Sequence, residues 1–418
     1  MIDYKKALLK LSKNKLKIKS EIISVEKSLN RISSTDLRSP NNYPAADNTA
    51  FDGFAISSKE TNKIKNRNLK KFKIIKTLAA GDNPNIKNIP KFSTIEVMTG
   101  AVIKKPFDTV IPIEQINFFP NSSKPKYIII KKKIKKNNFI RFLGSDFKKG
   151  EIIIKKGEII NSQHILAFKT LGIKRILVKK KPNIIFYSTG NEISNSVKLP
   201  NWKVRNSNTY YLKSFLENLP FIFKEKKILR DNDLLKFKKE IEINLRSNND
   251  IIITSGAVSA GKFDFVPKII KKFKISNFFK DVAIRPGKPI LFAKFKNKEK
   301  VFFGLPGNPI SSAACFRFFV YPYLSTILEI SEEKSFKARL NKKFTKKKKF
   351  TRFLKGKLTS TSNGNLKVEI LQGQESFRIK PFVKSNVWGV FKAGQSVFKK
   401  GQLIECHLPI ASNKNLFY

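Results

Sequence analysis

The sequence has few of the residues that build metal centres and redox sites. Its 418 residues include only two cysteines, Cys315 and Cys406, and only two histidines, His164 and His407. Each of the four lies in or beside an apolar segment, which is typical of a packing residue. So few thiols and imidazoles leave no closely spaced set for a tetrahedral zinc site, imply no disulfide framework, and argue against cysteine or histidine catalysis.

Long apolar runs are also missing. The first twenty residues, MIDYKKALLKLSKNKLKIKS, have no unbroken apolar core of the length that a signal peptide requires. No segment approaches the ~18–20 apolar residues of a transmembrane helix. The sequence therefore predicts a soluble, cytoplasmic protein without a membrane partner.

Acidic residues are scarce relative to basic ones. The chain carries 85 Lys and Arg against 31 Asp and Glu, a formal net charge of +54. Such a charge is typical of proteins that bind nucleic acid or anionic membranes. The lysines, however, are spread along the whole chain among many Ile, Asn and Phe, as expected when a genome drifts towards A and T. We favour drift over a dedicated basic surface, which would cluster its charge among aromatic side chains, and we expect no specific nucleic-acid partner.

The chain is long enough for several domains, and apolar residues make up 41% of it. In the first half of the chain, apolar residues over 2–18 have helical spacing, and short β-rich pieces separated by Pro, Gly and Asn follow. A further helix is expected to be capped by Asn161 or Ser162 and ended by Gly172. We predict an N-terminal helical and linking domain (1–27 and 143–180), a β-rich domain (28–142), an α/β domain (181–330) and a C-terminal β domain (331–418).

Strands and helices alternate from residue 183 onward. We expect strands at 184–190, 226–232, 250–256, 281–295 and 300–308, and helices at 206–219, 233–245, 265–273 and 309–324. A lysine-rich linker, KKFTKKKK at 342–349, then precedes short strands and turns. The fold class that follows is a multidomain α/β plus β protein, whose central sheet is mainly parallel and binds ligands beyond the carboxyl ends of its strands.

Four strand ends of the α/β domain carry polar, glycine-containing loops. They occupy 188–192, 254–264, 285–288 and 304–309. Glycines let backbone N–H groups approach an anion, and a helix N-terminus adds partial positive charge. Because Glu192, Asp264, Arg285 and Lys288 are interleaved with these loops, the sequence predicts an anion site with a hard cation such as Mg²⁺.

One of these loops has the spacing of a phosphate-binding P-loop. Gly256, Gly261 and Lys262 match GxxxxGK, but Phe263 stands where a P-loop places the hydroxyl that binds Mg²⁺. Asp264, one residue later, is able to bind a metal. We therefore interpret 254–264 as an anion and metal site of a different kind.

Taken in order, the motifs resemble those of molybdopterin molybdotransferases, a family that includes the C-terminal domain of gephyrin. The similar stretches are DNTAFDGFAI (47–56), MTGAVIKKPFDTVIPIEQ (98–115), STGNEI (188–193), TSGAVSAGKFD (254–264), RPGKP (285–289) and GLPGNPISS (304–312). The match runs from about residue 20 to the end, including SLNRISSTDLRSP (28–40) and LQGQESF (371–377).

The resemblance implies an enzyme of molybdenum cofactor biosynthesis. It would take adenylylated molybdopterin and molybdate and release AMP with the help of Mg²⁺. It would be a homodimer of four-domain subunits, with each active site between the α/β domain of one chain and the β domain of the other. A molybdopterin adenylyltransferase and molybdoenzyme acceptors would be its further partners.

The resemblance also assigns roles to residues of this chain. Catalytic roles fall on Asp52, Thr99, Glu192 and Asp264, and metal binding on Glu192, Asp231, Asp264 and Asp52. Substrate binding falls on Ser255, Gly256, Ser259, Arg285, Gly287, Lys288, Pro306, Gly307 and Asn308. Asp146, in the sequence GSD, matches a further acid of the family.

The chain departs from the family pattern in places, and alternatives stay open. Ala257 stands where a second glycine is usual, Asn191 where Asp is usual, and Phe51 and Phe54 where Met and Tyr are usual. A molybdopterin adenylyltransferase shares the α/β domain but is much shorter. A P-loop NTPase conflicts with Phe263 and lacks a clear second acid at a strand end, while a non-catalytic scaffold would use the basic surface.

Overall fold

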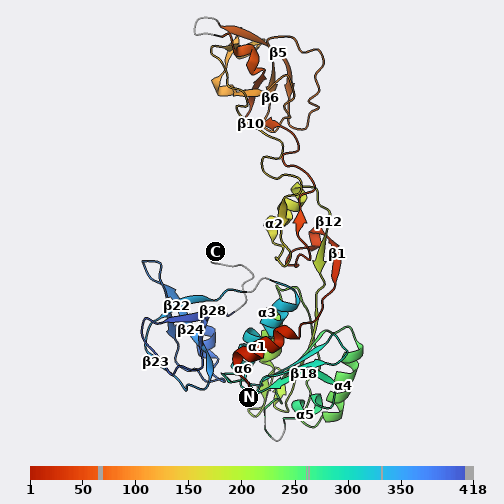
Figure 1. The fold of residues 1–418 in the computed structure, drawn as a ribbon, viewed down its shortest axis with the longest axis vertical. Helices are drawn as coiled ribbons and strands as arrows, with labels where there is room; N and C mark the ends of the chain where they lie inside the picture. The colour runs from red at the N-terminus through yellow and green to blue at the C-terminus, as the bar shows by residue number, and fades with distance from the viewer. Residues whose placement is uncertain (65–68, 260, 262–263, 331–332, 410–418) are drawn as a thin grey trace. The chain divides into compact units, whose positions relative to one another are not determined.

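The computed structural model describes residues 1–64, 69–259, 261, 264–330 and 333–409, so Lys262 and Phe263 lie outside the described residues. Its contacts divide the chain into two compact units (Figure 1). Unit 1 contains 1–35, 155–162 and 175–418, and unit 2 contains 36–154 and 163–174. The four domain boundaries expected from the sequence are finer than this division and stay a prediction.

The centre of unit 1 is a six-stranded sheet. Its order is β16 (Ile222–Glu225), β13 (Asn183–Ser188), β17 (Ile251–Ser255), β21 (Val301–Leu305), β20 (Leu291–Phe295) and β18 (Ile275–Lys280). The first four strands are parallel to one another, and β20 runs antiparallel to both of its neighbours, β21 and β18. The expected sheet is thus confirmed as parallel where the strand-end loops lie.

Helices cover both faces of this sheet, and the central strands β13, β17 and β21 are buried at nearly every position. Every second residue along each strand faces α3 (Ser207–Leu216) and the helix that begins at Pro309, on one side of the sheet. The others face α4 (Leu234–Arg246) and α5 (Val266–Ile270) on the opposite side (Figure 1). Such continuous apolar runs are typical of parallel strands buried on both faces.

One strand prediction in this region was wrong, and one strand was missed. The segment 226–232 forms no strand but only an isolated bridge between Leu229 and Thr189, while the edge strand precedes it as β16. The apolar pattern of β16 is weak because an edge strand is half exposed to solvent, as the 40% exposure of Ile222 shows. The strand β18 was not predicted, because ISNFFK is short and follows the lysine-rich segment 271–274.

The apolar helix expected over 309–324 is confirmed and slightly longer. It runs as α6 (Pro309–Cys315), a π turn over Phe316–Val320 and α7 (Tyr321–Ile327). Pro322 lies just after the π turn, where its missing N–H leaves a carbonyl to be satisfied otherwise. Arg317, on the π turn, is 1% exposed and binds both carboxylate oxygens of Glu333, at 2.6 and 2.7 Å.

The C-terminal part of unit 1 is a second, closed sheet, in agreement with the predicted C-terminal β domain. Its strands are β22 (Phe336–Leu340), β24 (Thr351–Ser360), β25 (Leu366–Ile370), β26 (Val387–Phe391), β28 (Leu403–His407) and the short β19 (Ile284–Arg285). The sheet closes because β24 pairs with β25 along one part of its length and with β26 along another.

The lysine-rich segment at 342–349 is not the linker that its composition predicted. It lies inside the C-terminal part, where β23 (Phe344–Thr345) pairs with β27 (Val397–Phe398). Lys346 is 8% exposed and donates hydrogen bonds to the carbonyls of Phe350 and Gln395. A lysine run alone therefore did not mark a domain boundary.

Unit 2 contains the expected β-rich region. Its six-stranded sheet has the order β7 (Thr109–Pro112), β4 (Gly53–Ile56), β6 (Ser93–Val97), β5 (Lys70–Leu78), β9 (Tyr127–Ile130) and β8 (Asn117–Phe119). Short pairs join β3 (Asn48–Thr49) to β10 (Ile140–Arg141), and β2 (Leu37–Arg38) to β11 (Ile152–Ile154). Each face of the sheet buries its own apolar cluster.

The N-terminal residues return to the core of unit 1. The helix α1 (Tyr4–Lys13) is shorter than expected, and Asp3 caps it by accepting from the N–H of Lys5 at 2.8 Å. The strand β1 (Ser20–Ser24) pairs with β12 (Arg175–Lys179). Between them, α2 (Ser162–Thr170) ends before Gly172, whose positive φ of 77° is the expected helix stop.

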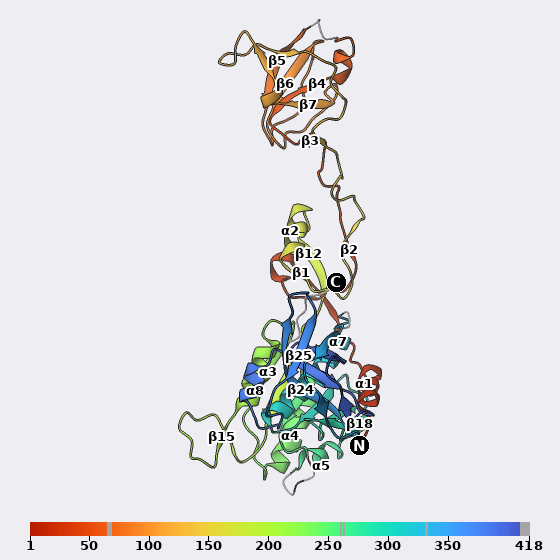
Figure 2. The same ribbon diagram turned by 90° about the vertical axis from the view of Figure 1, so that its left-hand side faces the viewer.

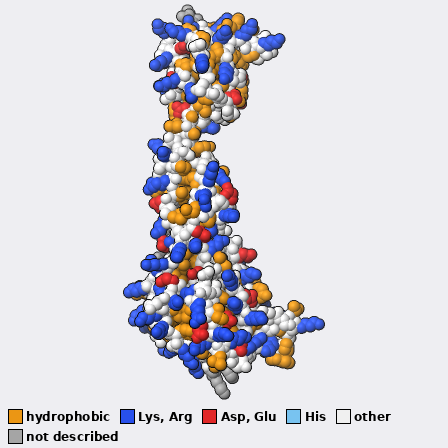
Figure 3. All heavy atoms as spheres, turned by 90° about the vertical axis from the view of Figure 1, so that its right-hand side faces the viewer, with side chains coloured by type: hydrophobic (Ala, Val, Ile, Leu, Met, Phe, Trp, Pro, Cys, Tyr) orange, Lys and Arg blue, Asp and Glu red, His pale blue; other side chains and the backbone are white. Residues whose placement is uncertain are grey.

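Two features bear on the expected partners. No helix within the described ranges is long and apolar enough to cross a membrane. Lys and Arg side chains are scattered over both units on the face shown in Figure 3, with no single basic field. That scatter supports the interpretation of the lysines as drift.

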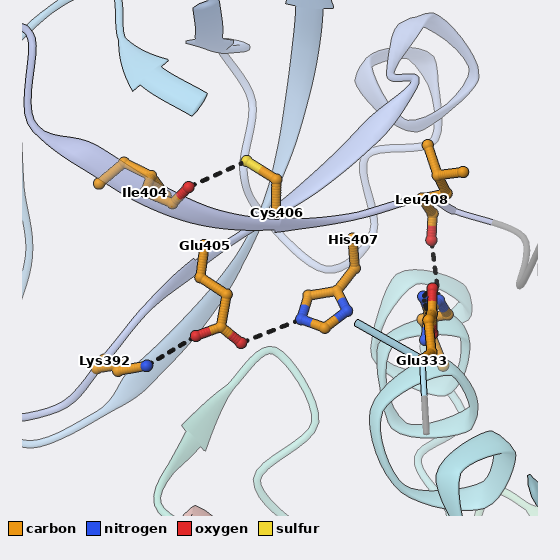
Figure 4. A network of polar contacts seen from close by, with 8 residues as sticks. Glu333, Lys392, Ile404, Glu405, Cys406, His407 and Leu408 are labelled. Carbon is orange, nitrogen blue, oxygen red and sulfur yellow. Dashed lines mark hydrogen bonds and ion pairs between the residues drawn. The ribbon is translucent and has the colours of Figure 1, made fainter. Parts of the chain in front are cut away.

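A polar network joins the end of β28 to the rest of unit 1 (Figure 4). Glu405 lies 3.1 Å from His407 Nε2 and 2.7 Å from Lys392 Nζ. Hydrogen bonds from His407 and Lys392 outweigh burial and lower the pKa of Glu405 from 4.5 to about 2. Nearby, Arg317 Nε donates to the carbonyl of Leu408 at 2.8 Å.

The depressed pKa of Glu405 predicts a pH dependence of stability. Its contribution is complete above the ordinary carboxyl pKa of 4.5 and is lost as pH falls towards about 2. In Glu405→Gln, the fall in unfolding free energy between those pH values should shrink by roughly 2 kcal/mol. Chemical denaturation at several pH values measures this, with Glu369→Gln as control because its pair with Lys342 is exposed. An unchanged profile in Glu405→Gln would contradict the prediction.

Candidate active site

Three parallel strands end at the same level at one edge of the central sheet. Ser188 of β13 is in register with Ser255 of β17, which is in register with Leu305 of β21. The loops that follow are joined at once, because the N–H of Thr189 donates to Ser255 O and the N–H of Gly256 donates to Leu305 O, both at 2.9 Å. This is the edge at which ligands of open α/β sheets bind.

Gly256 allows the first two loops to touch. Its φ is +103°, and a Cβ at this position would lie 2.5 Å from Thr189 O. The N–H groups of Gly256 and Gly190 are bonded to the carbonyls of Leu305 and Leu229. These two glycines therefore serve close packing of the chain, and they do not supply the free anion donors that the sequence suggested.

Ala257 occupies a conformation that glycine favours. Its φ is +53°, in the left-handed region where a Cβ costs about 1 kcal/mol or more. The second glycine that is usual in the family would remove that cost. The departure thus leaves the path of the loop intact and adds local strain.

Asn208 joins the second loop to the third, and sequence reasoning missed it. Its Nδ2 donates to Ser255 Oγ at 2.6 Å and to Gly307 O at 2.9 Å, and Ser255 Oγ in turn donates to Pro306 O at 3.2 Å. Asn208 is 9% exposed. The segment NSN at 206–208 was interpreted only as a helix start, although three small polar residues before a buried helix face were an available signal.

The first loop carries the predicted acid Glu192 and is bonded to the segment that carries the predicted acid Asp231. Asn191 and Asp231 are joined by two hydrogen bonds, from Asn191 N to Asp231 Oδ2 at 3.4 Å and from Asp231 N to Asn191 Oδ1 at 3.2 Å. The carboxylate of Glu192 folds back over Gly190, where a Cβ would lie 2.5 Å from Glu192 Oε2. The residue next to Glu192 is thus bonded to Asp231, although the two acids lie on different segments, and their metal-binding role stays a prediction.

Cationic side chains brace this acidic turn from two directions. Arg230 Nη1 donates to the carbonyls of Gly190 and Ile193, at 3.1 and 2.8 Å. Lys203 Nζ donates to Asn191 O from the projecting loop that carries β14 (Ile193–Ser194) and β15 (Val204–Arg205) (Figure 2). The turn is thus held through its backbone, while its carboxylates stay available to a ligand.

The second loop places Asp264 near its own backbone. Asp264 Oδ2 accepts from the N–H of Gly261 at 2.6 Å, and Asp264 N donates to Gly261 O at 3.1 Å. Lys280, at the end of β18, donates to Ser259 O at 2.6 Å. The unpredicted strand β18 thus contributes the cation that braces this loop.

The turn RPGKP lies beside the helix α6. Gly287 has φ +101°, and a Cβ there would lie 2.4 Å from Cys315 Sγ. Arg285 stands over the ring of Phe350, with its guanidinium carbon 5.0 Å from the ring centroid. Arg285 and Lys288 are both exposed, so their charges face solvent or a ligand.

The C-terminal sheet reaches the third loop through Ser376, which lies in the motif LQGQESF. Asn308 Nδ2 donates to Ser376 Oγ at 3.2 Å, and the N–H of Ile310 donates to Ser376 O at 3.3 Å. The loop is fixed by Lys355, which is 1% exposed and donates to the carbonyls of Gly373, Glu375 and Arg378. Burial lowers the pKa of Lys355 to about 8.

Two predicted residues meet in unit 2. Asp52 Oδ1 accepts from the hydroxyl of Thr99 at 2.7 Å and from its N–H at 2.6 Å, so the motifs at 47–56 and 98–115 are in contact. The hydroxyl and then the N–H of Thr99 lower the pKa of Asp52. Asp146 also lies in unit 2, where its N–H donates to Tyr43 O at 3.0 Å.

The predicted metal ligands do not form a preformed cage. Among the residues that the structure describes, no three His, Cys, Asp or Glu side chains are arranged to hold a metal ion. Mg²⁺ is usually held by one or two carboxylates together with substrate oxygens. The pair Glu192 and Asp231 fits that requirement, so these residues suit Mg²⁺ that arrives with a phosphorylated substrate.

Three family models match the chain in succession. Residues 2–172 match the MoeA N-terminal region (domain I and II), residues 185–326 a probable molybdopterin binding domain, and residues 337–408 the MoeA C-terminal region (domain IV).

Individual proteins are similar over nearly the whole chain. A molybdopterin molybdenumtransferase of Staphylococcus aureus (strain COL) is 31% identical over 413 residues, which cover 97% of this chain and 94% of that protein. One from Staphylococcus epidermidis (strain ATCC 12228) is 29% identical, with the same coverage. A crystal structure of the molybdopterin biosynthesis MoeA protein of Pyrococcus horikoshii is 25% identical and covers 99% of this chain and all of its own, with a TM-score of 0.83.

The contact between the first two loops predicts opposite outcomes for neighbouring substitutions. Gly256→Ala should lower the free energy of unfolding by roughly 3 kcal/mol, because the new Cβ overlaps Thr189 and the left-handed conformation becomes strained. Ala257→Gly should change it by less than about 1 kcal/mol, because relief of strain offsets the greater freedom of the unfolded chain. Equal losses in the two variants, measured by chemical denaturation, would show that this packing does not matter.

Proposed function

The chain belongs to the molybdopterin molybdenumtransferase family, and on that premise we propose that its strand-end loops bind adenylylated molybdopterin and molybdate and release AMP with the help of Mg²⁺. Membership makes the protein an enzyme of molybdenum cofactor biosynthesis. The observation that carries the proposal is the common strand edge, which gathers the acids Glu192 and Asp231 with the loops at Ser255, Gly256 and Pro306.

The chemistry of the substrates suits the groups at this edge. Molybdate is a tetrahedral dianion, and the exposed cations Arg285 and Lys288 are suited to bind it. Cleavage of a phosphoanhydride develops negative charge on oxygen, which preorganised cationic and N–H groups stabilise. Mg²⁺, when held by Glu192 and Asp231 with phosphate oxygens, would supply Lewis-acid stabilisation of the leaving phosphate.

The substrate-binding assignments follow the same loops. Ser255, Gly256 and Ser259 belong to the second loop, Gly287 to the RPGKP turn, and Pro306, Gly307 and Asn308 to the third. Asn208 and Ser376 hold the second and third loops in place from α3 and from the C-terminal sheet. We therefore add Asn208 and Ser376 as positioning residues.

The alternatives that the sequence left open are less well supported. A molybdopterin adenylyltransferase would not need the regions that match at 2–172 and 337–408. A P-loop NTPase conflicts with Phe263, and the N–H of Gly256, its first motif glycine, is already bonded to Leu305 O. A scaffold without activity is separated from the enzyme by turnover alone.

The second loop supplies the sharpest test of this function. Asp264→Ala should lower AMP release from adenylylated molybdopterin, with molybdate and Mg²⁺ present, by a factor on the order of 10² or more. Lys262→Ala should stay within a few-fold of the parent, because Lys262 occupies a position that the family leaves variable. Both variants should melt like the parent. An inactive Lys262→Ala beside an active Asp264→Ala would favour the P-loop, and an unmutated chain without turnover would favour the scaffold.

The roles proposed for Asp52 and Thr99 require a second copy of the chain. We propose that the unit 2 motif around Asp52 and Thr99 serves the active site of a homodimer partner. Light scattering should give a mass near twice 47.9 kDa. A strict monomer at micromolar concentration that still turns over would contradict the shared site. A molybdopterin adenylyltransferase and molybdoenzyme acceptors remain proposed as transient partners in the cytoplasm.

A further inference from the structure

Two arginines lie directly opposite each other where the C-terminal sheet meets the RPGKP turn. The strands β19 and β24 are parallel, and their register pairs Arg285 with Arg352. Like charges directly opposite each other on neighbouring strands destabilise a sheet. An anion bound beside the two guanidinium groups would offset that repulsion.

No acid of the protein fills that need within the described residues. Neither Arg285 nor Arg352 makes an ion pair there, although most other buried or half-buried arginines do. The nearest acid that acts on Arg352 is Glu375, whose carboxylate is paired with Arg378 at 3.1 Å. The guanidinium pair is thus uncompensated by the chain itself.

Arg352 is also incompletely hydrogen-bonded. Its Nε is buried and has no hydrogen-bond partner. Partial burial, and then the charge of Arg285, lower the pKa of Arg352. A buried donor without a partner costs on the order of 1–3 kcal/mol, so a ligand oxygen at this position would stabilise the folded state.

The surroundings fix the pair in place. The ring of Phe350 lies under Arg285, and the N–H of Thr351 donates to Ala283 O at 3.0 Å, which locks the two strands together. Lys355 lies three residues after Arg352 on the same strand and fixes the loop that contains Ser376, whose hydroxyl accepts from Asn308. Arg352 therefore lies on the strand whose Lys355 fixes the loop that contacts the third strand-end loop.

We propose that Arg352 is a substrate-binding residue, which together with Arg285 forms a two-guanidinium site for a tetrahedral oxyanion. Planar guanidinium groups offer paired N–H donors that match the oxygens of such an anion. Either molybdate or a phosphate group of the adenylylated substrate has this chemistry. The inference rests on the proposed function only for the identity of the anion, because the site itself is defined by the two arginines.

Oxyanion binding to the full-length chain tests the proposal without turnover. Isothermal titration with molybdate, and separately with AMP, should show binding that Arg352→Met weakens about 10-fold or more, as expected for a lost charge-assisted hydrogen bond. Arg352→Lys should fall between the two, because it keeps the charge and loses the planar fork. Arg339→Met, which changes an exposed residue of β22, is the matched control and should bind like the parent.

Stability separates a lost ligand contact from a damaged fold. Without anion, Arg352→Met should melt at or above the parent temperature, because it removes both the repulsion and the unpaired Nε. Molybdate or AMP should raise the melting temperature of the parent more than that of the variant. Weakening of molybdate binding alone or AMP binding alone identifies which anion uses the site, and either supports the proposal.

Other outcomes overturn it. The proposal fails if Arg352→Met binds both anions as tightly as the parent, or if the parent binds neither. These results are distinct from a failure of the proposed function. A chain that binds molybdate through Arg352 but releases no AMP contradicts the function and leaves the oxyanion site standing.

Discussion

The common level at which β13, β17 and β21 end is the constraint on which the rest of the site depends. Ser188, Ser255 and Leu305 are in register, so three loops leave the sheet side by side. Gly256 then allows backbone contact with Thr189, and Asn208 binds the second and third loops together. Parallel pairing fixes this register through side chains buried on both faces, so the geometry of the site derives from the apolar core.

Much of the fold was predictable because parallel strands and amphipathic helices have strong local patterns. The local sequence pattern fits only one type of element for β13, β17, β21, α3 and α4. The ordered glycine motifs placed the site at the ends of these strands. The edge strands β16 and β18 were not predictable in the same way, because half-exposed strands lose the apolar pattern. Lys346 shows the converse case, since its burial depends on carbonyls about 50 residues further along the chain, such as that of Gln395.

The residues that sequence reasoning missed act through others. Asn208, Ser376 and Lys280 bind backbone atoms or side chains of the predicted loops, and their role depends on tertiary contacts that no local pattern encodes. The glycines were recognised correctly as special positions, but for Gly190 and Gly256 the reason is close packing. A motif thus identified where the chemistry is located, while the contacts determined what each residue does.

The division of the chain into two units has a consequence for how the protein is made. The helix α1 buries Ala7 and Leu11 in the core of unit 1, and the Tyr323 hydroxyl donates to Asn14 O across 309 positions of sequence. During synthesis on the ribosome, the apolar face of α1 therefore waits for most of the chain to emerge. Unit 2, whose residues all lie between 36 and 174, has every one of its own contacts available much earlier. Vectorial synthesis thus leaves α1, although it is made before the segments that cover it, among the last elements of unit 1 to be buried.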